Sequence, residues 1–195
     1  MPRGRPREFD IEQALDTALE VFWRHGYEGT SLAQLSEAMD INLPSLYAAF
    51  GNKEALFTKV VDRYIEKPAS YLLKAIQQPT ARAVAEQAFR GAIDMISKPG
   101  AGDGCLLVHG ALASGPTAAS IREQLNNRRA GAEAAVCQRL EHAKAVGDLP
   151  ADADPVQLAR YLMTVIWGLS VQAAGGATRR QLKQTAALAM EAWPT

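Results

Sequence analysis

The residues best placed to contact another molecule lie in a short segment between positions 42 and 50. Ser45, Ala48 and Ala49 share one side of a predicted helix, and all three are small. The other side carries an apolar stripe of Leu43, Leu46 and Phe50. A helix of about eight residues is roughly 12 Å long, and the major groove of DNA is about 12 Å wide. The segment therefore predicts a helix that enters this groove, although a helical hairpin within an ordinary core would show the same stripe.

A second group of potential contacts is the N-terminal arm, residues 1–7. Its arginines, Arg3, Arg5 and Arg7, alternate with glycine and proline, which disfavours a packed helix. The Arg-Gly-Arg-Pro core is similar to an AT-hook, whose arginines enter the narrow minor groove of A·T-rich DNA. The arm therefore predicts minor-groove contacts, and a solvated tail is the alternative.

Cys105 is a candidate for covalent chemistry. It follows Gly104 at the predicted start of a helix, where the helix dipole lowers the pKa of a thiol. His109 lies one turn further on and could support a thiolate. This pair predicts a sensor of oxidants or electrophiles, and a buried small hydrophobic residue is the alternative. Two ligands are too few for a closed metal site, so we expect no bound metal.

The sequence gives little support to catalysis. It has no Gly-x-Ser-x-Gly motif, no phosphate-binding loop and no carboxylate pair with an obvious partner. The three histidines, His25, His109 and His142, fall on separate predicted helices. We therefore expect a protein that is not an enzyme and that needs no cofactor.

Two helices joined by a short turn must position residues 42–50. Thr30 is placed to cap the first helix, in which apolar residues recur at helical spacing up to position 39. Asp40 can adopt the left-handed conformation that ends such a helix. Asn42 is the predicted cap of the second helix, and Pro44 lies in its first turn, where a missing N–H does no harm.

Further helices are predicted on both sides of this pair. Asp10 opens a capping box for a helix that ends near Gly26, and Asn52 caps a helix that runs to about residue 67. Lys53 and the free N–H groups at the start of the latter helix could bind a phosphate. The rest of the chain predicts helices over residues 71–77, 79–97, 105–113, 117–146, 154–174 and 178–193.

Composition supports an all-α protein. Of the 195 residues, 48% are hydrophobic but only 7% are aromatic, and alternating β-branched runs are absent. The formal net charge is zero, so any affinity for DNA must come from individually placed cations. The sequence shows no long apolar run and no signal-peptide layout, so we expect a soluble cytoplasmic protein without membrane contact. Cys105 and Cys137 are then expected to be reduced.

The last two long helices are more apolar than surface helices need to be. Their apolar residues cover more than one stripe: Leu158, Leu162, Val165, Leu169 and Leu188. Helices of this kind often pair with a second copy of themselves, which predicts a homodimer through a four-helix interface. Burial within one larger core is the alternative.

Residues 8–60 resemble the TetR family of bacterial transcriptional regulators. The resemblance rests on the segments Gly29-Thr30-Ser31, Leu35-Ser36, Ile41-Asn42, Leu46-Tyr47, Phe50 and Asn52-Lys53-Glu54-Ala55-Leu56. The arm Gly4-Arg5-Pro6 is a common opening in that family, and residues 104–108 resemble one branch of its ligand domains more loosely. Asp40 stands where the family usually has glycine.

The resemblance implies a homodimer whose recognition helices enter successive major grooves of a palindromic site in double-stranded DNA, usually as a repressor. The positions of the family's phosphate contacts are Thr30, Tyr47 and Lys53. Its base-facing positions are Ala33, Asn42, Leu43, Pro44, Ser45, Ala48 and Ala49. Few of these side chains can form paired hydrogen bonds with a base, so we expect readout through thymine methyl groups, Ser45, Asn42 and DNA shape.

The resemblance also implies two domains, residues 1–66 for DNA binding and residues 67–195 for dimerisation and binding of a small-molecule effector. The expected lining residues of the ligand pocket are Phe89, Ile93, Met95, Cys105, His109, Leu112, Met163 and Trp167. The lack of clustered charge favours an apolar, neutral ligand. An architectural DNA binder without a ligand and a helical enzyme or carrier are the competing classes.

Overall fold

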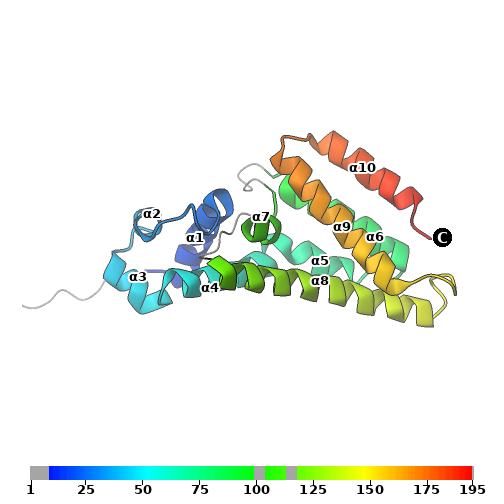
Figure 1. Cartoon of the computed structure of the whole chain (residues 1–195), viewed down its shortest axis with the longest axis horizontal. Coiled ribbons are helices and arrows are strands. Elements are labelled where there is room, and N and C mark those ends of the chain that lie inside the picture. Colours follow the sequence, from blue (N-terminus) through cyan, green and yellow to red (C-terminus); the bar gives the residue numbers. More distant parts are fainter. Residues whose placement is uncertain (1–8, 99–103, 113–117, 195) are drawn as a thin grey trace, which may run out of the picture.

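The computed structural model describes residues 9–98, 104–112 and 118–194, with side chains for all of these except residues 111 and 112. Over this part of the chain every regular element is a helix, which confirms the predicted all-α class. The molecule is elongated, with the N-terminal helices at one end and α10 at the other (Figure 1). Arg3, Arg5 and Arg7 lie outside the described residues, so their minor-groove contacts stay a prediction.

The predicted helix starts are largely confirmed. In chain order the elements are α1 (Ile11–His25), α2 (Leu32–Ala38), α3 (Leu43–Phe50), α4 (Lys53–Glu66), the 3₁₀ turn η1 (Pro68–Ser70), α5 (Tyr71–Ala75), α6 (Ala81–Ile96), α7 (Leu106–Leu112), α8 (Ala119–Ala145), α9 (Pro155–Ala174) and α10 (Arg179–Glu191). Side chains of Asp10, Asn42, Asn52, Asp154 and Thr178 each accept backbone N–H bonds at a helix start, as their types and positions predicted.

The cap of α2 differs from the prediction. Ser31, and not Thr30, accepts the N–H of Gln34, and the Gln34 side chain accepts the N–H of Ser31 in return. Thr30 is 1% exposed, and its hydroxyl donates to the carbonyl of Gly26 at 2.7 Å. Asp40 does adopt the left-handed conformation, with φ of 52°, so the turn between α2 and α3 forms without glycine.

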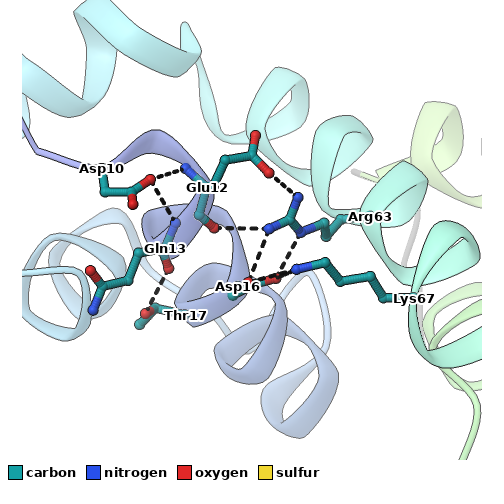
Figure 2. A network of polar contacts seen from close by, with 7 residues as sticks. All are labelled: Asp10, Glu12, Gln13, Asp16, Thr17, Arg63 and Lys67. Carbon is teal, nitrogen blue, oxygen red and sulfur yellow. Dashed lines mark hydrogen bonds and ion pairs between the residues drawn. The ribbon is translucent and has the colours of Figure 1, made fainter.

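α1 is fastened to α4 by an ion-pair cluster on the surface (Figure 2). The Arg63 guanidinium, on α4, donates to both carboxylate oxygens of Asp16, at 2.7 and 3.0 Å, and also pairs with Glu12. Lys67 donates to the same Asp16 carboxylate at 2.9 Å. Arg63 and Lys67 hold the pKa of Asp16 at about 2. The cluster joins the first helix of the chain to the helix that leads out of the N-terminal unit.

α9 contributes much of its apolar surface to the core of its own chain. Leu162 and Leu169, predicted to face a second copy, are 0% and 1% exposed because they pack among the helices of this subunit. Leu158 and Val165 are half-buried against the same core, whereas Leu188 on α10 is 66% exposed. The alternative of one larger core is therefore correct for Leu162 and Leu169, and Leu188 remains available to a partner.

No helix among the described residues is long and apolar enough to cross a membrane.

Candidate DNA-binding surface and ligand cavity

α3 presents one face to solvent and buries the other. Leu46 and Phe50 are 0% and 3% exposed and anchor the helix on the core of the N-terminal unit. Tyr47 is 50% exposed, and Leu43, which we expected in the apolar stripe, is 40% exposed. Of the predicted base-facing positions, Ser45 and Ala49 are half-buried and the others are exposed: Ala33, Asn42, Leu43, Pro44 and Ala48. The exposed face carries no charged side chain, and α3 lies at one end of the molecule (Figure 1).

Some polar groups of this surface already form hydrogen bonds within the protein. The side-chain oxygen of Asn42 accepts the N–H of Ser45 at 2.9 Å, which leaves the amide NH₂ of Asn42 as a possible donor to a base. Thr30 does not fit its predicted contact with a phosphate in this structure, because its side chain is buried and its hydroxyl already donates to Gly26.

Lys53 is held in place at the first residue of α4. Its ammonium nitrogen lies 4.4 Å from the centroid of the Tyr27 ring, a cation–π contact. Burial lowers the pKa of Lys53, an effect that Glu28 opposes. The Lys53 ammonium and the positive dipole end of α4 therefore lie together, directly after the end of α3.

A cavity of about 350 Å³ lies between the end of α4 and helices α5 to α9. Met95, Cys105, Met163 and Trp167 line this cavity, as predicted. Most of the remaining lining is aliphatic, and helices α4 to α9 all contribute to it. Its size and composition are those of a site for a small, largely apolar molecule.

The other predicted lining residues do not border this cavity. Phe89 and Ile93 face a separate groove between α6 and α10, because they lie on the opposite side of α6 from Met95. His109 points back toward Gly104, where its Nε2 atom is buried without a hydrogen-bond partner among the described residues. The side chain of Leu112 lies outside the described residues.

The pKa of the Cys105 thiol is shifted in the direction opposite to the prediction. Burial raises the pKa of its thiol, although the hydroxyl of Tyr64, 3.2 Å from the sulfur, opposes the effect. No hydrogen bond joins the side chains of Cys105 and His109 in the described residues, since His109 is directed toward Gly104. The predicted lowering of the thiol pKa is wrong because removing the thiol from water outweighs the dipole of a helix as short as α7.

Residues 104 and 105 contact both α1 and α4 of the N-terminal unit. The indole N–H of Trp23, on α1, donates to the carbonyl of Gly104 at 2.8 Å. The rings of Trp23 and Tyr64 meet edge to face, with centroids 5.0 Å apart. Sequence reasoning missed these contacts; the clue was Trp23, whose N–H requires a partner when its ring is packed.

A helix-turn-helix unit whose second helix has an exposed face, joined to a helical unit that encloses a largely apolar cavity, defines the class of helix-turn-helix DNA-binding proteins. The comparisons with known proteins agree. Residues 14–60 match the sequence profile of the bacterial regulatory proteins of the tetR family, and residues 74–192 match the tetracyclin repressor-like C-terminal domain. The protein belongs to the TetR family of transcriptional regulators.

Individual relatives extend over nearly the whole chain. The chain is 35% identical to the transcriptional repressor ComR of Escherichia coli, covering 98% of this chain and 92% of ComR. Among solved structures, a cysteine mutant of the TetR family regulator CifR in complex with a 26-base-pair operator has 39% identity and a TM-score of 0.92, covering 97% of this chain and all of that one. A putative TetR regulator from Rhodococcus sp. RHA1 has 43% identity, a TM-score of 0.64 and coverage of 95% and 99%. These relatives are regulators, which confirms the prediction that the chain is not an enzyme.

Proposed function

We propose that the protein is a repressor that binds a palindromic operator as a homodimer and leaves it when a small molecule occupies the cavity. The observation that carries the proposal is the uncharged, exposed face of α3, with the positioned Lys53 directly after the end of this helix. ComR is named a repressor, and the CifR structure contains operator DNA. On this proposal, residues 1–66 bind DNA and residues 67–195 dimerise and bind the effector.

Recognition of the operator would rest on methyl contacts and single hydrogen bonds from short side chains. Ala48 and Leu43 can pack against thymine methyl groups, and Ser45 and the NH₂ of Asn42 can donate hydrogen bonds to base edges. Tyr47 and Lys53 would contact phosphates, which sets affinity and position but carries no sequence information directly. We therefore expect the shape of the DNA to contribute to specificity.

Selection of bound sequences from random duplex DNA tests this part of the proposal. The wild type should enrich a palindrome whose half-sites are about one helical turn apart or somewhat more. Ala48→Glu, which places an acid on the exposed face of α3, should abolish enrichment, whereas Ala134→Glu at an exposed position on α8 should not. Enrichment of the same palindrome by Ala48→Glu would show that α3 does not enter the groove.

The proposed dimer interface is the outer face of α9 and α10. The hydroxyl of Tyr161 donates to the carbonyl of Ala189 at 3.0 Å, which ties the two helices together. Their outer side exposes Val171 and Leu188, 45% and 66% exposed. Gly168 lies on the same side of α9, and a Cβ atom added there would meet nothing within 4 Å in this chain. A glycine without a neighbour allows the backbone of a second copy to approach closely.

Gly168→Glu tests this interface, because the substitution fits the isolated chain but would obstruct a partner. We expect the variant to sediment as a folded monomer and to lose operator affinity. Ala134→Glu, a glutamate at an exposed position on α8, should remain dimeric. A dimeric Gly168→Glu variant would place the interface elsewhere.

We propose that the effector binds without a covalent bond. The sequence allowed an apolar or an electrophilic effector, and an electrophile requires a thiolate. Burial raises the pKa of Cys105, which leaves the thiol protonated at neutral pH and favours the apolar alternative. A screen for compounds that release the selected operator tests the assignment. If no compound releases the operator, the architectural class of DNA-binding protein replaces this proposal.

A further inference from the structure

The cavity has two chemically different walls. On one side, α4, α5 and α6 contribute aliphatic side chains, including Ile65, Leu72 and Ile96. On the other side, α8 and α9 contribute the polar residues Asn127, Arg128, Arg129 and Ser170, beside apolar residues such as Ala132 and Met163. A uniformly apolar ligand would leave the polar groups of this second wall without a partner.

Arg129 is a cation without an acidic partner. Its guanidinium carbon lies 5.7 Å from the centroid of the Trp167 ring, and it donates to the side-chain oxygen of Asn126 at 2.5 Å. Two acids of the region are already engaged, because Asp62 pairs with Arg128 and Glu133 pairs with Arg160. Within the described part of the chain, no carboxylate lies within 4.0 Å of Arg129. Its charge therefore remains available at the cavity wall.

The hydroxyl of Ser170 is a second polar group of this wall that lacks a partner among the described residues. Ser170 is 2% exposed, and its hydroxyl is buried. It follows Trp167 by one turn of α9, about 4.5 Å along the helix axis, so it lies on the same side of the helix. Buried hydroxyl groups nearly always have a partner, and a ligand atom in the cavity would supply one.

We infer that the cavity binds an amphipathic acid, with its apolar body against α4 to α6 and its carboxylate at Arg129 and Ser170. The inference rests on the proposed effector role of the cavity and names the class of effector. A carboxylate suits the fork of a single guanidinium and can accept the Ser170 hydrogen bond with its second oxygen. A dianion such as phosphate would bring two charges to one unpaired cation in an apolar cavity, which is unfavourable.

The test compares two probes of the same length, octanoate and 1-octanol. Each is titrated against displacement of Nile red, a neutral dye, from the full-length protein, with the intrinsic tryptophan fluorescence, to which Trp167 contributes, as a second readout. We expect octanoate to bind at least about ten-fold more tightly than 1-octanol, because it makes charge-assisted hydrogen bonds. Arg129→Gln should remove this preference without weakening 1-octanol.

Ser170→Ala separates ligand binding from a structural role. Because the hydroxyl has no partner in the free protein, its removal should leave the melting temperature unchanged or raise it. The same variant should weaken octanoate several-fold and leave 1-octanol unchanged. A lower melting temperature with unchanged octanoate affinity would overturn the role of Ser170.

The two negative outcomes have different meanings for the acidic class of ligand and for the cavity itself. If Nile red binds and both probes displace it equally from wild type and Arg129→Gln, the cavity binds ligands but the acidic class is wrong. If Nile red does not bind, or neither probe displaces it, the cavity is not a ligand site and the effector part of the proposed function fails as well.

Discussion

Replacing Asp16 by asparagine removes the central carboxylate of the cluster that fastens α1 to α4 (Figure 2). The pKa of Asp16 falls from 3.8 to about 2 on folding, chiefly through its hydrogen bonds with Arg63. At about 1.4 kcal/mol per pKa unit, this difference would correspond to about 2.5 kcal/mol. The side chain is 44% exposed, and screening by solvent reduces the expected contribution to about 1 kcal/mol. This would lower the melting temperature by roughly 2–4 °C.

The contribution of Asp16 should depend on pH with a defined sign. Because folding lowers its pKa, the stabilisation is fully present above about pH 4 and is lost as the pH falls from 4 toward 2. Urea unfolding at fixed protein concentration should therefore show Asp16→Asn less stable than wild type at pH 7, with the difference shrinking at pH 3. Glu86→Gln, which removes an exposed pair with Arg82 on α6, is the control and should change stability by about 0.3 kcal/mol. An equal difference at pH 7 and pH 3 would refute the electrostatic explanation.

Three further predictions concern DNA and ligand responses. Tyr47→Phe should weaken binding to all sequences alike in a salt titration, whereas Ser45→Ala should change the selected sequence; a changed preference with Tyr47→Phe would mean that the roles are misassigned. Trp23→Phe should destabilise the protein by about 1–2 kcal/mol in urea unfolding and reduce operator release by effector, because the Gly104 carbonyl loses its donor; normal release would remove Trp23 from the signal path. Cys105 should react with a thiol reagent at pH 7 more slowly than a free model thiol, and faster reaction would restore the electrophile hypothesis.

The helices were predictable because their start signals are local. An aspartate, asparagine or threonine followed by a periodic apolar face fixes a helix start within a few residues, as at Asn42 and Asp154. The choice between Thr30 and Ser31 was not predictable in the same way, since both can cap. Packing decided it: Thr30 is buried with its hydroxyl on Gly26, and Ser31 remains at the surface.

The cavity was less predictable because its properties depend on contacts between distant residues. Met95 and Phe89 are both apolar residues of α6, but only Met95 lies on the side that faces the cavity. The acidity of Cys105 depends on burial and on Tyr64, which is 41 residues away in the chain. Helical periodicity identifies an apolar side of a helix but does not say whether the neighbouring helix fills the space beside it.

The contacts around residues 104 and 105 explain how a ligand could act on DNA binding. Cys105 lines the cavity and accepts from Tyr64 of α4, while Gly104 accepts from Trp23 of α1. Because Arg63 holds α1 and α4 together, movement of residues 104 and 105 would act on both helices at once. We therefore expect a ligand to turn the N-terminal unit as one body and change the separation of the two recognition helices in the proposed dimer, without distorting α3. Asp16→Asn should then show two effects together. It should be less stable in urea, and it should release a smaller fraction of the operator at saturating effector, because a weaker α1–α4 cluster lets α1 and α4 move separately.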